Sequence, residues 1–337
     1  MDLKQRAAMA VIRTGRQWLG RTQVARWPLA GAVVRQIVHL GYGSRPTRTA
    51  FRDLELTVPP SGSSITAGLL GGYYETIELD LFERLCAESR TVVDVGANLG
   101  VYSCLAARRL PPGGRVVAFE PVPENRALLR ENVERNAARG AGEAGVDVVV
   151  EPLAVGAAAG TAVLRLARDC GQHFVTVDGS RGVPVRQVAL DDHLPGLLGD
   201  GPDRSPVDVL KVDTEGYEGH VLRGARRILA EDRPTLLVEY CRDTLTRAGF
   251  RVEEFADLLA EVYDTIHVVD ATAACVRTGA PRDLLTRPYG NRLFNIAAAA
   301  RPEHAAVLAA WAARHTGRPR HAARHTRPLV PATEDTR

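Results

Sequence analysis

The chain has 337 residues, of which 45% are hydrophobic, and this is enough for one large globular domain with terminal additions. Its formal net charge of +3 conceals an asymmetry, because residues 1–50 hold nine basic residues and one acidic residue, and residues 301–337 hold seven and three. The body between them therefore carries excess negative charge. Such a body is a poor match for a nucleic-acid backbone, whose binding requires clustered positive charge, so we expect no nucleic-acid partner.

The five cysteines are odd in number and widely spaced, and no C-x-x-C pair is present in the sequence. They are typical of reduced thiols rather than of a disulfide framework or a zinc site. No run of residues reaches the roughly 18 to 20 apolar residues that a membrane span requires. We therefore expect a cytoplasmic protein.

Residues 1–50 are predicted to form a basic helical extension. Residues 4–20 place apolar side chains on one helical face, and Pro28 is suited to open a second helix. Packing of this extension on the domain is the preferred interpretation, and contact with an acidic membrane surface is the alternative. Residues 53–72 follow with a pattern that predicts short strands and turns.

From residue 73 onward, helix and strand patterns alternate through the predicted domain, residues 51–313. Helices are predicted at residues 101–110, 123–138, 216–229 and 252–262, and strands at residues 90–96, 114–121, 146–155, 207–213, 234–240, 264–270 and 292–300. This order indicates an α/β fold with a doubly wound, mostly parallel sheet. The last two strands have no predicted helix between them, so we expect them to pair as an antiparallel edge. Residues 314–337, without apolar period, are predicted to be a disordered basic tail.

The segment "TVVDVGANLGVYS", residues 91–103, ends a buried strand with Asp94 and encloses a short loop between Gly96 and Gly100. A nucleoside triphosphate site would need G-x-x-x-x-G-K-[ST], which the sequence lacks. A dinucleotide site favours G-x-G-x-x-G, and a carboxylate beside the loop is unfavourable to a pyrophosphate. S-adenosylmethionine (SAM) carries an ammonium and a sulfonium and no phosphate, so the loop suits SAM better.

Glu120 follows the next predicted strand, 24 residues after Gly96. An acid at this position holds ribose hydroxyls in related folds. NAD would use such an acid too, so a dehydrogenase stays open as an alternative. Together with Asp94 and the glycine loop, Glu120 favours a SAM site.

A second polar cluster lies in "VDVLKVDTEGYEGHVLRGARRIL", residues 207–229. Lys211 is one of only two lysines in the chain, and it shares one side of the predicted strand with Asp213 and Glu215. A compact ammonium in an arginine-rich chain suggests a site. Acids at a helix start, including Glu218, also stabilise the helix dipole, so a structural role is equally open.

These segments resemble the FkbM family of SAM-dependent methyltransferases. The resemblance rests on "VVDVGANLGVYS", "GRVVAFEPVPENRALLRENVERN", "EPLAVG", "VDVLKVDTEGYEGHVLRGA" and "PTLLVEY", and it covers about residues 73–240. It implies a class I methyltransferase fold, which is Rossmann-like with seven strands in the order 3-2-1-4-5-7-6. It also implies methyl transfer to a small molecule, most often at a hydroxyl of a sugar or secondary metabolite.

The resemblance also implies roles for particular residues. Four would line the methionine end of SAM: Asp94, Gly96, Asn98 and Gly100. Glu120 would hold the ribose, and the segment around Ala154 would approach the adenine. Four more would face the transfer site: Lys211, Asp213, Glu215 and Glu218.

For the chemistry we predict that Asp213 or Glu215 takes the proton of an acceptor hydroxyl, with Lys211 holding their charge and orientation. His173, in the variable stretch before the fourth strand, is the rival base. A catechol-type magnesium site would bring two acids and an Asn or Asp together across the fourth and fifth strands. Asp213 and Glu239 could contribute, but no Asn follows Glu239, so no metal is expected. N-methylation of a small molecule or peptide and a catalytically silent SAM-binding protein are the alternatives. The fourth strand ends in "VDTEG" rather than [DN]-P-P-[YFW], which disfavours methylation of nucleic-acid bases or glutamine.

Overall fold

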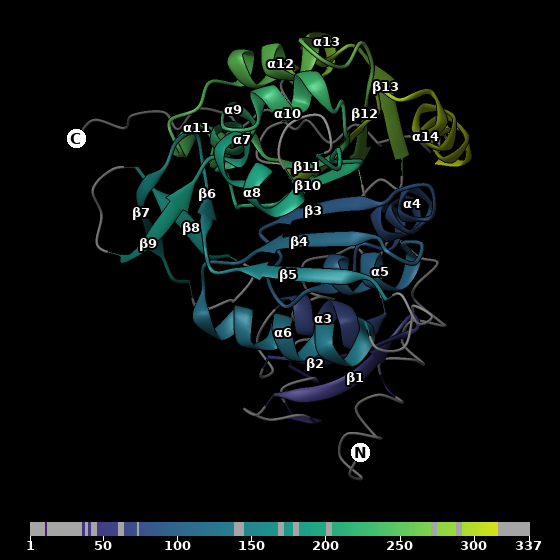
Figure 1. The fold of residues 1–337 in the computed structure, drawn as a ribbon, viewed down its shortest axis with the longest axis vertical. Coiled ribbons are helices and arrows are strands. Elements are labelled where there is room, and N and C mark those ends of the chain that lie inside the picture. Colours follow the sequence, from purple (N-terminus) through teal and green to yellow (C-terminus); the bar gives the residue numbers. More distant parts are fainter. Residues whose placement is uncertain are drawn as a thin grey trace, which may run out of the picture.

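The computed structural model (Figure 1) describes residues 46–59, 64–72, 74–137, 145–167, 172–177, 182–199, 204–270, 275–287 and 292–315, and also Val11, Gln36, Ile37, Leu40 and Gly41. Most of the predicted N-terminal extension, and the predicted tail beyond residue 315, lie outside the described residues. No helix among those residues has the length and apolar character to cross a membrane.

The central sheet has eight strands in the order β13-β12-β14-β11-β10-β3-β4-β5. Their bounds are β3 (Thr91–Val95), β4 (Arg115–Phe119), β5 (Asp147–Glu151), β10 (Val209–Val212), β11 (Thr235–Tyr240), β12 (Ile266–Asp270), β13 (Cys275–Gly279) and β14 (Phe294–Ala298). The five strands from β5 to β11 are parallel, and β14 runs antiparallel to both neighbours. Seven of the strands reproduce the predicted order 3-2-1-4-5-7-6, so the class I methyltransferase fold is confirmed.

The eighth strand, β13, corrects the predicted edge. The last two predicted strands, β12 and β14, do pair antiparallel, but β13 pairs with the other side of β12 and forms the edge. A short helix, α13 (Pro281–Leu285), then leads back to β14. The segment was missed because its pattern, with Arg277 and Thr278 between apolar residues, is too short to stand out as a strand.

Helices cover both faces of this sheet, which divides the core into two hydrophobic clusters. Consecutive residues of β3 show the division, because Val92 belongs to one cluster and Val93 to the other. The cluster of Val92 packs against α4 (Thr76–Ala87), α5 (Val101–Arg109), α6 (Pro123–Ala137) and α14 (Pro302–His315). The cluster of Val93 packs against α9 (Glu218–Arg223), α10 (Arg226–Glu231), α11 (Arg242–Arg247) and α12 (Val252–Ala260).

An antiparallel hairpin, β1 (Thr47–Phe51) and β2 (Leu54–Val58), packs on α6. Asn132 on that helix accepts a hydrogen bond from Thr57 N at 2.6 Å and donates one to Thr57 O at 3.0 Å, as a neighbouring strand would. Residues 53–72 were predicted to be strands and turns throughout, but α3 (Ser64–Gly71) occupies their last part. Its described side chains from residue 65 on are buried, so burial rather than amphipathic periodicity stabilises this helix.

A separate four-stranded sheet lies beyond the carboxyl ends of β4 and β5 (Figure 1). Its order is β6-β9-β7-β8, with β6 (Ala154–Val155), β7 (Gly160–Arg165), β8 (Phe174–Thr176) and β9 (Val183–Val188), and it leads into α7 (Leu190–His193) and α8 (Pro195–Leu198). The single strand predicted at residues 146–155 breaks at Pro152, which cannot donate to a strand ladder. The chain thereby leaves the central sheet and covers its carboxyl end.

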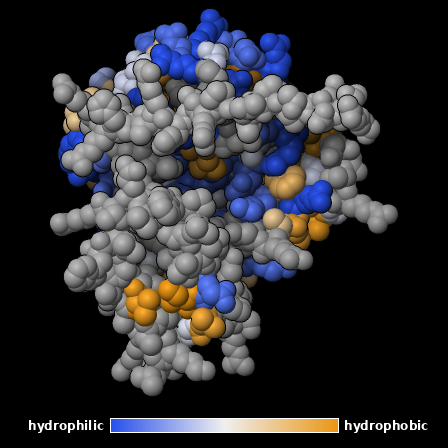
Figure 2. All heavy atoms as spheres, turned by 180° about the vertical axis from the view of Figure 1, so that it is seen from behind, coloured by the Kyte–Doolittle hydropathy of each residue, from blue (hydrophilic) through white to orange (hydrophobic). Residues whose placement is uncertain are grey.

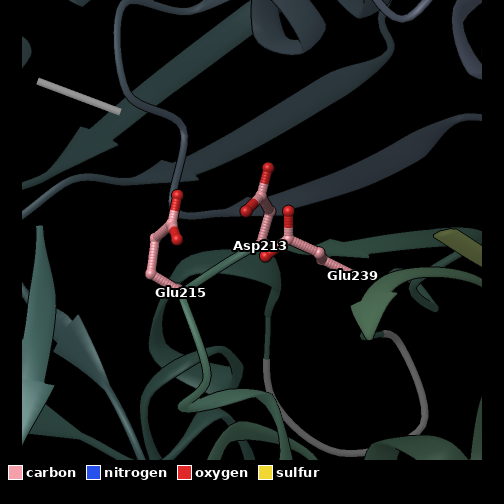
Figure 3. A group of neighbouring side chains, drawn as sticks. All are labelled: Asp213, Glu215 and Glu239. Carbon is pink, nitrogen blue, oxygen red and sulfur yellow. The ribbon is translucent and has the colours of Figure 1, made fainter. Parts of the chain in front are cut away.

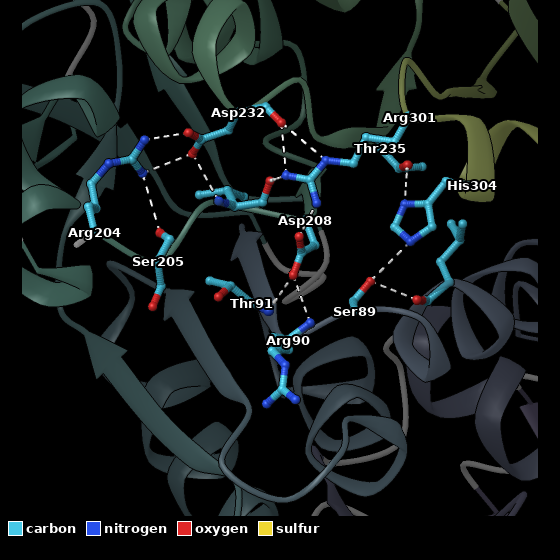
Figure 4. A network of polar contacts seen from close by, with 12 residues as sticks. Ser89, Arg90, Thr91, Arg204, Ser205, Asp208, Asp232, Thr235, Arg301 and His304 are labelled. Atoms are coloured by element: carbon cyan, nitrogen blue, oxygen red, sulfur yellow. Dashed lines mark hydrogen bonds and ion pairs between the residues drawn. The ribbon is translucent and has the colours of Figure 1, made fainter. Parts of the chain in front are cut away.

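The amino ends of β3 and β10 are fixed by a polar network (Figure 4). Asp208 accepts hydrogen bonds from the backbone of Arg90 at 2.7 Å and Thr91 at 2.9 Å, and it forms an ion pair with Arg301. His304 lies between Thr235 Oγ1, at 2.6 Å, and Ser89 Oγ. Arg301 and His304 lie at the start of α14, a helix that the sequence did not predict, so the network ties this helix to the sheet. The helix runs to His315, past residue 314, where the predicted tail begins.

Candidate functional site

A cavity of about 300 Å³ lies at the carboxyl ends of the parallel strands. It is lined by eight of the eleven predicted site residues: Gly96, Asn98, Glu120, Ala154, His173, Lys211, Asp213 and Glu215. Asp94 and Gly100 do not line it, and neither does Glu218. Figure 2 shows the face opposite to Figure 1, where hydrophobic side chains of described residues lie in a hollow near the middle and in a group lower down. Leu293, 53% exposed, lines the cavity and adds an apolar edge to it.

Glu120 lies at one end of the cavity and is only 4% exposed. Its two oxygens accept hydrogen bonds from the backbone N–H groups of Asn98 at 2.9 Å and Val122 at 2.8 Å. Burial raises the pKa of Glu120 to about 7, although these two backbone donors lower it. A carboxylate held from both sides in this way has lone pairs left for a ligand's hydroxyl groups.

The two glycines of the loop have different functions. Gly96 has φ +79°, and a β-carbon there would lie 1.8 Å from the backbone oxygen of Asp213. Gly100 has φ +90°, and its β-carbon would lie 2.5 Å from a methyl group of Leu129 on α6. Gly100 does not line the cavity and serves the packing of α5 against α6, so its contact with the cofactor stays a prediction.

Asp94 lies beneath the cavity and is fully buried. Ser103 Oγ donates a hydrogen bond to its Oδ2 at 2.6 Å, and Lys211 Nζ lies 3.8 Å from its Oδ1. Burial raises the pKa of Asp94, while Lys211 and Ser103 lower it. Asp94 was predicted to line the methionine end of the cofactor, but in this structure it supports Lys211 from below.

Lys211 is almost fully buried at the centre of this charge group. Its ammonium lies 3.3 Å from Asp213 Oδ2 and 4.6 Å from the centre of the Tyr102 ring, over the ring face. Burial on its own would lower the pKa of Lys211, but Asp213, Asp94 and Glu75 raise it above its usual value. Lys211 therefore stays charged, which fits an organising role and excludes it as a general base at neutral pH.

Three carboxylates from two strand ends converge at the other end of the cavity (Figure 3). Asp213, Glu215 and Glu239 each offer an oxygen within 4.8 Å of the other two. Burial raises the pKa of Glu239 well above its usual range, and the neighbouring Asp213 and Glu215 raise it further. A proton or a cation bound here would relieve the repulsion among the three acids. The sequence predicts that no metal binds here.

Glu218 and His173 occupy positions that limit their chemistry. Glu218 Oε1 accepts hydrogen bonds from Thr214 N at 2.8 Å and Gly216 N at 3.0 Å, so it braces the loop after β10 instead of facing the transfer site. His173 lines the cavity, but its Nδ1 accepts a hydrogen bond from Ala167 N at 3.0 Å. In the neutral ring, Nε2 then carries the proton, and the lone pair of Nδ1 is engaged by this hydrogen bond. The imidazole is therefore not available as a base.

The sequence-based prediction assigned no role, or only a minor one, to three residues of the cavity: Glu75, Tyr102 and Glu239. Tyr102 OH donates to Glu75 Oε2 at 2.5 Å, and Glu75 immediately precedes α4. Glu75 lies outside any recognised motif. The one sequence signal for it was an acid at the start of a helix, directly after "GGYY". Glu239 is the penultimate residue of β11, beside the strand that Asp213 follows, and that adjacency was available from the predicted strand order.

Comparison with known proteins agrees with this geometry. Residues 94–266 match the model of the methyltransferase FkbM domain. The hexuronic acid methyltransferase AglP of Haloferax volcanii is 29% identical over 166 residues, which are 48% of this chain and 59% of that protein. The chain thus spans less than two thirds of this relative.

Two solved structures are also similar. The methyltransferase FkbM from Methylobacillus flagellatus KT has 23% identity and a TM-score of 0.29, covering 45% of this chain and 33% of that one. The O-methyltransferase TomG from Streptomyces achromogenes, solved with SAM, has 17% identity and a TM-score of 0.37, covering 67% and 80%.

The strand order and the cavity at the carboxyl ends of the parallel strands define a class I methyltransferase. Since the family model matches just over half of the chain, the protein belongs to the methyltransferase FkbM domain family, and the predicted family is confirmed.

Proposed function

We propose that this FkbM-family methyltransferase transfers a methyl group from SAM to a hydroxyl group of a small molecule, such as a sugar or a secondary metabolite. The observation that carries the proposal is that one cavity is lined both by Glu120, after β4, and by Asp213, Glu215 and Glu239, from the ends of β10 and β11 on the other side of β3. Glu120 suits ribose hydroxyls, and the three acids suit an acceptor that must lose a proton.

The donor set fits SAM. Glu120 is fixed to accept hydrogen bonds from the ribose, Gly96 and Asn98 line the turn beside it, and Ala154 lies in the wall where the adenine is expected. No lysine or arginine besides Lys211 lines this cavity among the described residues, which disfavours a phosphorylated cofactor such as NAD. Bound SAM supplies an electrophilic methyl group on a sulfonium.

The chain's own residues supply orientation and the proton acceptor. An alcohol is almost fully protonated at neutral pH, so a carboxylate within about 2.6 to 3.2 Å of the acceptor hydroxyl is needed to receive its proton as the new O–CH₃ bond forms. Asp213 and Glu215 are the leading candidates, and Lys211 keeps Asp213 in place at 3.3 Å. The several carboxylates also match the neighbouring hydroxyl groups of a polyol.

Apolar residues form another part of the cavity wall: Leu153, Val155, Leu164, Val175 and Leu293. A mixed wall of this kind suits a small molecule with both hydroxyl groups and apolar surface. It is a poor match for an anionic acceptor, because the acids exceed the one lysine.

The proposal is tested with SAM carrying a labelled methyl group and a panel of sugars, hydroxylated metabolites and amines. We expect label in a product that survives mild base, because ethers are stable there whereas methyl esters release methanol. Label in a basic, acid-extractable product would instead support N-methylation. Tight SAM binding without transfer to any small-molecule fraction would favour the catalytically silent alternative.

A further inference from the structure

Glu75 is held in an unusual backbone conformation at the wall of the cavity. It has φ 38° and ψ 42°, in the left-handed region, and it directly precedes α4. A residue with a β-carbon rarely adopts this conformation unless its surroundings hold it there. The surrounding contacts maintain it, because Leu79 N donates to Glu75 O at 2.9 Å and Tyr102 OH donates to Glu75 Oε2 at 2.5 Å. The backbone and Tyr102 together fix the carboxylate in the cavity wall.

The electrical surroundings of Glu75 favour a cation beside it. Burial and then Asp213 raise its pKa, Lys211 and Tyr102 lower it, and the net pKa is about 7. Among the described residues that line the cavity, Lys211 is the one lysine or arginine, and its ammonium already lies between Asp213 and Asp94. A second positive group next to Glu75 would therefore stabilise its ionised form.

Glu75 also lies at the end of the cavity where methyl transfer is proposed. Its charged neighbours are Asp213 and Lys211, at the strand ends where transfer is proposed, whereas Glu120 is bound to Asn98 and Val122 at the other end. The methionine part of the cofactor extends from the ribose toward the transfer end. Asp94, the acid expected to meet that part, is covered and does not line the cavity.

We propose that Glu75 accepts a hydrogen bond from the α-ammonium group of the cofactor's methionine part, with Tyr102 holding the carboxylate in place. This inference rests on the proposed function, because it presumes a SAM site. It assigns to Glu75 the role that the sequence pattern gave to Asp94.

The test compares ligands that differ only in the amino-acid part. S-adenosylhomocysteine carries the ammonium and the carboxylate, its decarboxylated form carries only the ammonium, and 5′-methylthioadenosine carries neither. Their affinities are measured by calorimetry for the wild type, Glu75→Gln, Tyr102→Phe and Glu88→Gln. Glu88 is an exposed acid that directly follows α4, so its variant is the matched control.

We expect Glu75→Gln to weaken both ammonium-bearing ligands by about tenfold or more, as for loss of a charge-assisted hydrogen bond. The affinity for 5′-methylthioadenosine should stay within twofold, and Glu88→Gln should change none of the three. Tyr102→Phe should show the same selectivity to a smaller extent. An equal loss for all three ligands in Glu75→Gln, or no loss for any, would overturn the role of Glu75. A wild type that binds none of them would overturn the SAM site itself.

Discussion

The β-carbon position of Gly96 lies 1.8 Å from the backbone oxygen of Asp213, so the loop after β3 and the end of β10 are in direct contact. Asp213 N also donates to Val95 O at 3.0 Å, which holds the two strand ends together beside the cavity. Gly96 is therefore required by the fold of the site, before any ligand binds.

Gly96→Ala should destabilise the protein more than Gly113→Ala. Both glycines have φ +79°, but a β-carbon at Gly113 would meet nothing within 4 Å. The Gly113 variant should cost about 1 kcal/mol for the left-handed backbone alone. The Gly96 variant should cost roughly 1 to 3 kcal/mol more, because the strand ends must separate. Chemical denaturation of both variants measures the difference, and equal losses would show that the loop yields without strain.

Cofactor affinity should rise with pH because of Glu120. Its pKa of about 7 in the ligand-free protein lies above its ordinary 4.5, and ribose hydroxyl groups donate to the ionised form. Binding should therefore release a proton, and affinity should increase from pH 6 to pH 8. The same shift makes Glu120 favour folding below pH 4.5, and this contribution is lost as pH rises to about 7.

Calorimetry with 5′-methylthioadenosine, in buffers of different ionisation enthalpy, measures the proton released through Glu120, because this ligand has no ammonium to engage Glu75. Glu120→Gln should weaken binding by about tenfold or more and remove the pH dependence. Glu124→Gln, an exposed acid on α6, is the control. Wild-type affinity that is constant between pH 6 and pH 8 would argue against the ribose assignment.

The alternation of buried strands and helices could be predicted from short apolar runs along the chain, and the order of the central sheet followed from the family resemblance. Val92 and Val93 illustrate the reason, since a strand buried on both faces reads as a nearly continuous apolar run. The elements that were missed depend on tertiary contacts. β13 is stabilised by pairing with β12, α3 by burial, and the start of α14 by the network of Asp208 and Arg301.

The candidate site was predicted as a set of residues but not as an arrangement. The spacing of Glu120 and Asp213 along alternating strands places both at one edge of the sheet, and this follows from topology alone. Which acid reaches the cavity depends on side-chain direction and backbone conformation. Asp94 points inward from a strand and is covered, whereas the left-handed backbone at Glu75 brings a residue from outside any motif into the wall.

Removal of divalent cations should leave methyl transfer unchanged. The ammonium of Lys211 lies 3.3 Å from Asp213, so the acid that would be central to a metal site already has a positive partner. We expect the same rate after dialysis against EDTA and after addition of Mg²⁺ or Mn²⁺. A rate that falls after chelation and returns with Mg²⁺ would show that Asp213, Glu215 and Glu239 share an ion.

A carboxylate, not His173, should take the acceptor proton. Asp213 and Glu215 lie among the converging acids, whereas His173 Nδ1 is engaged by Ala167 N at 3.0 Å. With the acceptor that the labelling panel identifies, turnover is measured at saturating SAM for Asp213→Asn, Glu215→Gln and His173→Ala, each checked for SAM binding. Loss of the general base should lower turnover by about 10²- to 10⁴-fold, and His173→Ala should stay within a few-fold. If both carboxylate variants stay near wild type while His173→Ala loses turnover, the hydrogen bond from Ala167 must break during the reaction and the histidine carries the proton.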